Sequence, residues 1–389
     1  MKAIIYASNI RAGGAIGGAA NLLDTLPDFY GTVHMNWARD WFVYVSEEIA
    51  SEMSRLDELR DLGVTVVQRT DPANLRTLRR RGEVWADVRL VLRGPDYVGR
   101  MATREILGFA DRSILTPAAR HQPIFDRVRA SGRNALKRKL LSRYDAFLTQ
   151  TDSMAKELSA RVPGRQVWVF PNAPADIFLG QDPLPRPVQM PVIVNNLPLV
   201  RLFYPARGYP HKNHQLIPKT AEILRSKYGV ELEVVCTLRH DELRRLGLEN
   251  ARGIVAVGAL SRTECYEQYR LSDGVFFPSL NETSSVTPLE GMALGLPVFS
   301  SNLEFITDIS GSAPYYFDPA DPVEAAVVIA HFYANPLSGS GRLSEGAAFV
   351  HALPTRQDTT RGHLDAMRSI SNVSRNTGTS GSAKRPRST

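Results

Sequence analysis

The chain has 389 residues, of which 43% are hydrophobic and 22% are charged, and its formal net charge is +7. That length exceeds one ordinary hydrophobic core and suits two domains of roughly 150–200 residues each. Its two cysteines, Cys236 and Cys265, exclude a disulfide framework and a cysteine-rich metal site, and no apolar run reaches the roughly 18 residues that cross a bilayer. A globular protein of the reducing cytoplasm is therefore expected.

Strand-like and helix-like segments alternate through the first half of the sequence. The first, Lys2–Ser8, predicts a β-strand rather than a signal peptide, because its apolar run is short and leads into glycines. The other predicted strands are Trp41–Val45, Val64–Gln68, Val88–Leu92, Ser113–Thr116, Ala146–Gln150 and Val167–Phe170, and the predicted helices are Gly17–Leu26, Glu47–Leu62 and Ser153–Ala160. Such alternation is typical of a parallel, doubly wound α/β sheet.

A proline-rich stretch then interrupts the pattern. Seven prolines fall between 171 and 198, which indicates a linker. The alternation resumes with strands at Arg201–Tyr204, Glu231–Cys236, Gly253–Val257, Gly274–Phe277 and Pro297–Ser300, and with helices at Gln215–Tyr228, Asp241–Leu248, Ser261–Leu271 and Pro288–Leu294. We therefore expect an N-terminal Rossmann-like domain (1–172), a linker (173–198), a second Rossmann-like domain (199–342), a C-terminal helical segment (343–372) and a disordered tail (373–389).

The positive charge is concentrated in two places. Four basic residues and no acid fall in the last 17 residues, where a solvated tail is expected. A second segment, 127–143, carries seven basic residues and no acid, beside Leu136, Leu140 and Leu141. It is either a solvated helix face or a patch for an anionic membrane surface. Nucleic-acid binding is not expected, since aromatic residues do not interleave the basic ones.

Two loops of the second domain carry the residue types of an anion site. Arg207 and Lys212 lie five residues apart between a strand and a helix, where two cations suit a diphosphate, although exposed surface charge is an alternative. Glu282 lies between the strand Gly274–Phe277 and the next helix, where packing does not require an acid. Glu290 has a structural alternative, a capping box in which Thr287 is the N-cap residue.

Together these two loops resemble the retaining glycosyltransferases of family 4, which have the GT-B fold. The resemblance rests on the loop P-x-R-x-x-x-x-K-N, on Glu282 and Glu290 with seven residues between them, and on the flanking stretches FFPS, GMALGLPV and YYFDPADP. It spans about 120 residues here. The glycines near the N-terminus, in NIRAGGAIGGAANLL, and the segment 147–174 are also similar, whereas 30–145 match poorly.

The resemblance implies a role for each matching residue. Arg207 and Lys212 would bind the diphosphate of a nucleotide-sugar donor, Glu290 the ribose hydroxyls, and Glu282 the donor sugar. The other implied donor contacts are Gly17, Gly18, Thr283, Ser284, Ser285, Val286, Thr287 and Leu260. Thr283, Ser284 and Ser285 stand where the family usually has glycines, which leaves the sugar's identity open. Ser261 and Glu264, beside Leu260, also form a capping box in their own right.

The first domain provides weaker candidates. The family commonly places a histidine of this domain near the donor sugar, and His121, in a predicted loop, is preferred over His34. Asp96, in the loop after the strand Val88–Leu92, is a candidate for acceptor binding.

The resemblance implies a hexosyltransferase that retains the anomeric configuration, and the two cations predict a reaction that needs no metal and no cofactor. The donor would be a nucleoside-diphosphate hexose such as GDP-mannose or a UDP-sugar, and the acceptor a saccharide or lipid-linked molecule of bacterial cell-surface polysaccharide, lipopolysaccharide or glycolipid synthesis. The enzyme would be cytoplasmic, or peripheral on the inner face of the membrane. Alternatives are a sugar-nucleotide epimerase or phosphorylase on the same fold and, more remotely, a basic nucleic-acid-binding protein.

Overall fold

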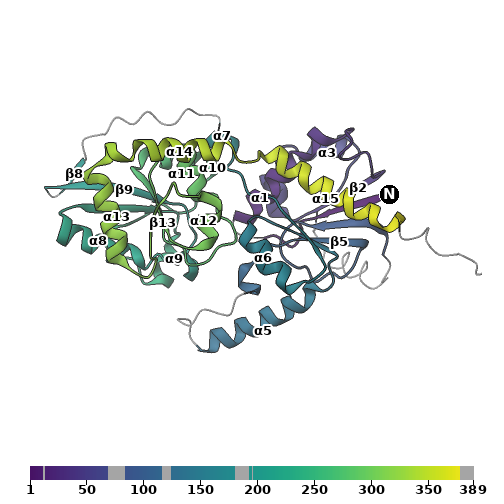
Figure 1. Cartoon of the computed structure of the whole chain (residues 1–389), viewed down its shortest axis with the longest axis horizontal. Coiled ribbons are helices and arrows are strands. Elements are labelled where there is room, and N and C mark those ends of the chain that lie inside the picture. Colours follow the sequence, from purple (N-terminus) through teal and green to yellow (C-terminus); the bar gives the residue numbers. More distant parts are fainter. Residues whose placement is uncertain (12–13, 69–83, 116–123, 180–191, 195, 377–389) are drawn as a thin grey trace, which may run out of the picture. The chain divides into compact units, whose positions relative to one another are not determined.

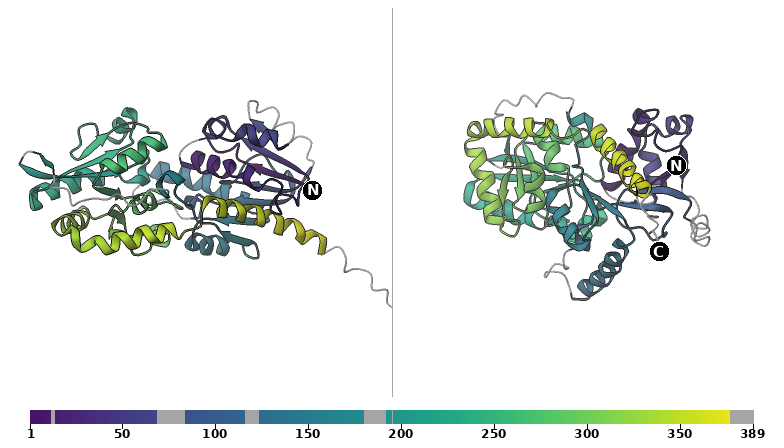
Figure 2. Two further views of the ribbon diagram at one scale, coloured as in Figure 1. Left: turned by 90° about the horizontal axis from the view of Figure 1, so that it is seen from above. Right: turned by 45° about the vertical axis from the view of Figure 1, so that its right-hand side comes forward.

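The computed structural model describes residues 1–11, 14–68, 84–115, 124–179, 192–194 and 196–376. The chain forms two compact units (Figures 1 and 2). Unit 1 consists of 1–149, 155–170 and the chain from 356 onward, and unit 2 consists of 150–154 and 171–355.

A parallel sheet of seven strands forms the centre of unit 1. In chain order they are β1 (Lys2–Tyr6), β2 (Asp40–Val45), β3 (Thr65–Gln68), β4 (Ala86–Val91), β5 (Ala102–Gly108), β6 (Ala146–Thr149) and β7 (Gln166–Val169). Their order across the sheet is β3-β2-β1-β4-β5-β6-β7. The central strand β1 is almost wholly buried, as expected of a parallel strand covered on both faces.

Helices from both ends of the chain cover this sheet. They are α1 (Gly14–Asp24), α2 (Glu47–Glu52), α3 (Leu56–Asp61), α5 (Ile124–Leu141), α6 (Asp152–Arg161) and α15 (Arg356–Asn376), with short 3-10 turns η1 (Leu26–Phe29) and η2 (Arg112–Ile114). The last helix, α15, packs against α1 and β4 (Figure 1). Thr25 and Thr360 hydrogen-bond through their hydroxyls at 2.6 Å. The C-terminal segment therefore completes the core of unit 1.

Unit 2 has a second, mostly parallel sheet. Its strands are β8 (Val192–Val194), β9 (Leu197–Tyr204), β10 (Glu231–Cys236), β11 (Ile254–Ala256), β12 (Gly274–Phe277), β13 (Val298–Ser301) and β14 (Tyr315–Phe317). The parallel order is β11-β10-β9-β12-β13-β14, and β8 adds to β9 in the antiparallel direction. Alternate residues of β9 enter different cores, Leu202 and Tyr204 on one face and Phe203 on the other.

The helices of unit 2 form a layer on each face of this sheet. They are α7 (Asp176–Leu179), α8 (Leu216–Ile223), α9 (His240–Leu246), α10 (Arg262–Leu271), α11 (Thr287–Ala293), α12 (Glu304–Ser310), α13 (Pro322–Ala334) and α14 (Ser340–His351), with turns η3 (Pro210–Lys212), η4 (Leu224–Tyr228, a π-helical turn) and η5 (Pro336–Gly339). Pro218 is the third residue of α8, where its missing N–H removes no helical hydrogen bond.

Two predicted elements of the first half are wrong, and one strand was not predicted. The helix Glu47–Leu62 is two helices, because the carboxylate of Asp24 accepts the backbone N–H groups of Ser54 and Arg55 between them. The strand Ser113–Thr116 is a 3-10 turn as far as it is described. The real strand, β5, was missed because charged residues inside it, among them the buried Glu105, hide its apolar pattern.

Two predicted boundaries also change. The segment predicted as a linker (173–198) contains α7, β8 and the start of β9 among its described residues. The predicted helical segment 343–372 is two helices, α14 and α15, separated near Pro354. Since α15 extends to Asn376, only residues 377–389 of the predicted tail lie outside the described residues.

Candidate functional site

The loop after β9 is fixed by hydrogen bonds on both sides of Lys212. The Tyr204 hydroxyl donates to the backbone oxygen of Lys212 at 2.9 Å. Asn213 adopts the left-handed conformation (φ 57°), and its side-chain amide donates to the backbone oxygens of Pro278 and Pro319. The backbone of Lys212 is therefore anchored to the sheet and to two neighbouring loops.

The structure brings Lys212 and Glu282 together. Lys212 Nζ forms an ion pair with Glu282 Oε1, and each side chain is only 16% exposed. The hydroxyl of Ser279, which is buried, donates to the same oxygen at 2.8 Å. His211 Nε2 lies 3.9 Å from it. A residue predicted to contact the sugar and one predicted to contact the diphosphate thus form one cluster.

The other predicted cation, Arg207, is held by a carboxylate that the sequence did not single out. Arg207 Nε donates to Glu242 Oε1 at 2.8 Å, and the backbone N–H of Gly208 donates to the same oxygen at 3.1 Å. The backbone N–H of Arg239 donates to Glu242 Oε2 at 3.0 Å. Burial alone raises the pKa of Glu242, but these three donors outweigh it and hold the pKa below its ordinary value.

Gly208 is required where α9 meets this loop. A Cβ at Gly208 would lie 2.8 Å from the Cβ of Glu242, a distance that real side chains do not adopt. The absence of a side chain lets Glu242 approach the backbone closely enough to accept its N–H. This close contact sets the position of Arg207.

Glu290 does not cap its helix. The N-cap residue of α11 is Val286, Thr287 is the first helical residue, and neither forms the predicted capping box. Glu290 Oε2 instead accepts a hydrogen bond from the hydroxyl of Tyr269 at 2.8 Å. Burial raises the pKa of Glu290 to about 7, although the hydrogen bond from Tyr269 and the charge of Arg262 oppose the shift. Helix capping therefore does not explain the carboxylate at position 290.

Tyr269 is fully buried on α10, and its ring packs edge-on against Phe203 and Phe178. In the sequence it cannot be distinguished from an ordinary core aromatic, so it was missed.

The remaining predicted donor contacts lie in two loops. Thr283, Ser284, Ser285 and Val286 connect β12 to α11, and all are partly exposed. The Ser284 hydroxyl is buried and has no hydrogen-bond partner among the described residues. Leu260 precedes α10, and the alternative explanation for its neighbours is confirmed, because Ser261 and Glu264 form a reciprocal capping box.

The loops with Arg207, Lys212 and Glu282 meet at the switch point of the sheet. After β9 the chain continues toward β10 and β11, whereas β12, β13 and β14 lie on the other side of β9. Connections on either side of such a point run over opposite faces and leave a crevice at the carboxyl ends of the strands. The loop after β9 carries Arg207 and Lys212, and the loop after β12 carries Glu282.

The glycines of the first unit have a different position from the one predicted. The helix α1 begins at Gly14, three residues before the predicted start, so Gly17 and Gly18 lie inside it rather than at its beginning. A Cβ at Gly18 would lie 2.9 Å from Nη2 of Arg93. The group that approaches Gly18 most closely is thus the guanidinium of Arg93.

Only one of the two candidate histidines of unit 1 lies among the described residues. His121 lies outside the described residues. His34 Nδ1 lies 2.7 Å from Asp365 Oδ1 on α15, and its ring packs edge-on against Phe29. His34 therefore contacts both the turn η1 and the last helix, α15, and this structural role explains the residue.

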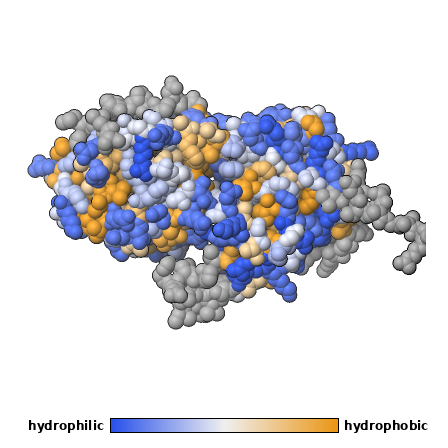
Figure 3. Space-filling view, viewed as in Figure 1, coloured by the Kyte–Doolittle hydropathy of each residue, from blue (hydrophilic) through white to orange (hydrophobic). Residues whose placement is uncertain are grey.

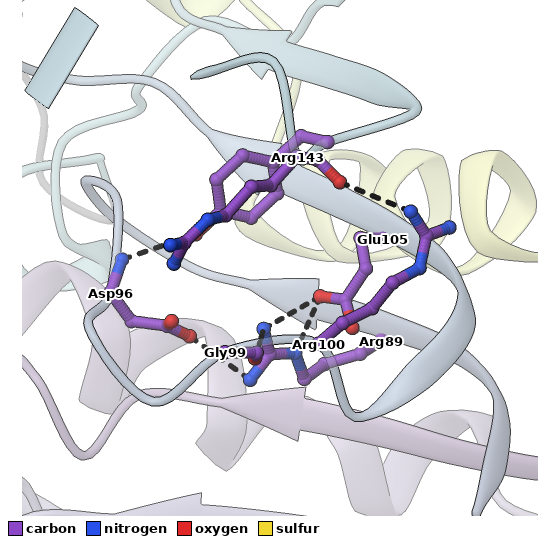
Figure 4. Close-up of a pocket in the computed structure, with 7 residues that line it drawn as sticks. Arg89, Asp96, Gly99, Arg100, Glu105 and Arg143 are labelled. Carbon is purple, nitrogen blue, oxygen red and sulfur yellow. Dashed lines mark hydrogen bonds and ion pairs between the residues drawn. The ribbon is translucent and has the colours of Figure 1, made fainter. Parts of the chain in front are cut away.

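Asp96 belongs to a buried ion cluster (Figure 4). The guanidinium of Arg89 lies between two carboxylates, with Nη1 3.0 Å from Asp96 Oδ2 and Nη2 2.6 Å from Glu105 Oε2. Tyr144 accepts the backbone N–H of Asp96, and a small pocket opens beside the cluster toward Arg100 and Arg143. Fixing the loop between β4 and β5 is a sufficient role for Asp96.

The basic segment 127–143 lies mostly on α5, and two of its three leucines are unavailable to a membrane. Leu140 and Leu141 are buried in the protein, whereas Leu136 is 54% exposed. Lys137 pairs with Asp111 at 2.7 Å, and Arg138 donates to the backbone oxygen of Ile114. The predicted apolar stripe is therefore wrong for Leu140 and Leu141.

No metal or membrane feature stands out in the described part of the chain. It holds no group of three or more His, Cys, Asp or Glu side chains arranged to bind a metal ion. None of its helices combines the length and hydropathy needed to span a bilayer. On the face that Figure 3 shows, hydrophilic residues are spread over both units.

Sequence comparison covers part of the chain. Residues 200–335 match the family model described as Glycosyl transferases group 1. This range holds Arg207, Lys212, Glu282 and Glu290. No curated protein matches the chain.

Comparison with solved structures covers nearly the whole chain. A glycosyltransferase from Rickettsia africae has a TM-score of 0.61 and 14% identity over 95% of this chain and 98% of its own. HepE from Anabaena, in complex with UDP and glucose, has a TM-score of 0.62 and 15% identity over 95% and 100%. An α,α-trehalose-phosphate synthase (UDP-forming) from Burkholderia vietnamiensis has a TM-score of 0.62 and 13% identity over 95% and 99%. The predicted fold, two Rossmann-like units of the GT-B type, is confirmed.

Proposed function

We propose that the chain is a glycosyltransferase that takes a hexose from a nucleoside-diphosphate sugar. The observation that supports this most is the cluster of Lys212 and Glu282 at the switch point of unit 2. The family-model match over the same residues supports a glycosyltransferase. Neither a nucleic-acid binder nor a purely structural domain accounts for two cations and two largely buried carboxylates around the ends of β9 and β12.

Each side chain has a role in this proposal. Arg207 keeps its terminal guanidinium nitrogens for the diphosphate while its Nε is bonded to Glu242, and Lys212 adds a second positive charge. As the bond between the sugar's anomeric carbon and the diphosphate breaks, these cations stabilise the charge that develops on the leaving group. The acceptor oxygen forms the new bond to the anomeric carbon, and its proton passes to a departing phosphate oxygen. Glu282 positions the sugar, and Glu290 accepts the ribose hydroxyls.

This mechanism is proposed to retain the anomeric configuration and to need neither a metal nor a cofactor, since protein cations supply the charge. HepE was crystallised with UDP and glucose, which makes a UDP-sugar the first donor to test. The acceptor is proposed to be a saccharide or a lipid-linked molecule.

Calorimetric titration tests the donor site directly. We expect UDP, GDP or ADP to bind the wild type, and its affinity to fall about a hundredfold or more in Lys212→Ala. Lys219→Ala, on α8, is the matched control. If no nucleoside diphosphate binds the wild type, the proposal is wrong. Incubation with the bound nucleotide's sugar alone, followed by NMR, separates the alternatives, because an epimerase changes the sugar without an acceptor.

Membrane attachment through α5 is a separate part of the proposal. Lys139 and Leu136 are the exposed residues that support it. Flotation with anionic vesicles, comparing wild type with Leu136→Ser/Lys139→Ala, tests it. Equal recovery of both proteins in the vesicle fraction contradicts it, and so does recovery of neither.

A further inference from the structure

Unit 1 has a switch point of its own, at the carboxyl ends of β1 and β4. From β1 the sheet continues to β2 and β3 on one side and to β4 through β7 on the other. By the same rule that applies to unit 2, a ligand site is expected where the loops after β1 and β4 separate. Those loops carry Ser8 and Asn9 after β1, and Arg93 after β4.

Arg93 is fixed at this point from two directions. The side-chain amide of Asn9 donates to the backbone oxygen of Arg93 at 2.7 Å. The guanidinium packs on α1 at Gly18, where any Cβ would lie 2.9 Å from Nη2. Gly18 thus makes room for a cation at the edge of the sheet, and the cation is held by both its backbone and its side chain.

Two side-chain oxygens of the loop after β1, the loop that holds the Arg93 backbone, lack hydrogen-bond partners in the described part of the chain. The Ser8 hydroxyl is fully buried, and neither Ser8 Oγ nor Asn9 Oδ1 has a hydrogen-bond partner among the described residues. Burying polar oxygens without partners is costly, so a site that contains them is expected to receive a ligand that donates hydrogen bonds to them.

The charge at this point is positive. Burial lowers the pKa of Arg93, which remains protonated at neutral pH because an arginine starts far above it. His363 approaches from α15 and is neutral at pH 7. Burial, together with the charge of Arg93, lowers its pKa to about 4, although its hydrogen bond to the Thr359 carbonyl opposes the shift.

We propose that the switch point of unit 1, formed by Arg93, Asn9 and Ser8, binds the anionic group of a hydroxylated acceptor such as a sugar phosphate or a sugar acid. The guanidinium makes two parallel hydrogen bonds to phosphate or carboxylate oxygens. A neighbouring hydroxyl of the same molecule donates to Asn9 Oδ1. That this ligand is the acceptor rests on the proposed glycosyltransferase function, whereas the anion site itself does not.

Calorimetric titration of the full chain with glucose 6-phosphate, glucuronate and glucose tests the site. The Lys212→Ala background keeps the cation of unit 2 from competing for the anions. We expect at least one of the two anions to bind about tenfold more tightly than glucose, and the stronger one identifies the group. Arg93→Gln is expected to remove that advantage.

Arg100→Gln is the matched control, because Arg100 precedes β5 at the opposite edge of the sheet and pairs with Asp145 at 2.6 Å. It should leave the preference for an anion unchanged. Should Arg93→Gln fail to fold, Arg93→Lys keeps the charge but loses the two parallel bonds, and a severalfold weaker anion affinity is expected. The proposed site is contradicted if Arg93→Gln still prefers an anion to glucose. It is also contradicted if the protein with Arg93 intact shows no such preference. A wild type that binds anions but no nucleoside diphosphate overturns the proposed function alone.

Discussion

The two units carry the same sheet geometry but complete their switch points differently. In unit 2 both cations are already bonded to protein carboxylates, Arg207 to Glu242 and Lys212 to Glu282. In unit 1 the loop that holds the Arg93 backbone carries two side-chain oxygens that have no partner among the described residues.

The difference indicates two kinds of recognition. A network of paired charges holds its side chains in position before a ligand arrives, so binding costs little reorganisation. Polar oxygens that lack partners favour instead a ligand that supplies the missing hydrogen bonds. In the proposed function, the paired charges of unit 2 suit the nucleoside diphosphate, which leaves whatever the acceptor is. The unpartnered oxygens of unit 1 suit the recognition of one kind of acceptor.

The largest expected effect concerns the paired cluster. Lys212→Ala removes the cation that we propose stabilises the leaving group, and we expect turnover with a UDP-sugar to fall about 10²- to 10³-fold. Arg93→Gln should lower turnover mainly through the KM of an anionic acceptor. Measuring kcat and the KM values of the donor and the acceptor distinguishes the effects of the two variants. Identical kinetic profiles for the two variants would show that the units do not divide the substrates in this way.

The buried carboxylate of unit 2 makes folding stability depend on pH. The pKa of Glu290 is about 7 in the fold and about 4.5 in its ordinary state, so the fold disfavours the ionised form. Relative to Glu290→Gln, wild type is therefore expected to lose stability as the pH rises from about 4.5 to about 7. Urea unfolding at pH 5 and pH 8 should show the variant gaining up to about 3 kcal/mol on wild type between the two values.

Two neighbouring groups on α10, Cys265 and Tyr269, do not ionise in that window, because burial raises the pKa of each above its already high ordinary value. Glu264→Gln is the control, because the hydroxyl and backbone of Ser261 hold the pKa of Glu264 below its ordinary value. Its stability difference from wild type should not change between pH 5 and pH 8. A flat difference for Glu290→Gln as well would mean that Glu290 is not destabilised by burial.

A smaller effect is expected from the carboxylate behind Arg207. Glu242→Gln weakens the bond that orients the guanidinium, and we expect nucleoside diphosphate to bind about tenfold less tightly, with little change for the nucleoside. In an Arg207→Ala background the same change should have almost no effect on nucleoside diphosphate affinity, because the guanidinium that Glu242 orients is absent. Glu231→Gln is the control. Glu231 is a buried residue of β10, and its carboxylate pairs with Arg225. Equal losses in both backgrounds would show a purely structural role.

What the sequence could and could not predict follows from the range of the contacts. Arg207 and Lys212 lie in one short segment, and Glu282 and Glu290 lie in another. Because the spacing within each segment is local, the sequence pattern alone predicts them as site residues. Their partners come from elsewhere in the chain and have ordinary patterns of their own. Glu242 looks like an acidic residue in the first turn of a helix, and Tyr269 like a core aromatic.

The same limit applies in unit 1. The contact of Gly18 with a donor stays a prediction, and only the fold shows that Arg93, 75 positions later in the sequence, packs on it. Asp24 ends a predicted helix from about 30 positions away. Hydrophobic periodicity predicts an element from its own residues, whereas a side chain from a distant segment decides where that element breaks.

The smallest expected effect tests whether the paired network of unit 2 tunes binding or merely packs. Tyr269→Phe keeps the ring against Phe203 but removes the hydrogen bond to Glu290. Because that bond lowers the pKa of Glu290, its loss should raise the pH at which the carboxylate ionises and accepts the ribose hydroxyls. We expect nucleoside diphosphate affinity to fall about threefold to tenfold at pH 7 and to recover by pH 8.5. Tyr333→Phe, which removes a hydrogen bond to the backbone oxygen of Asp273, should leave the pH profile unchanged. A loss of the same size at both pH values would mean that Tyr269 only shapes the core, and that the carboxylates of unit 2 are held by packing rather than by the network.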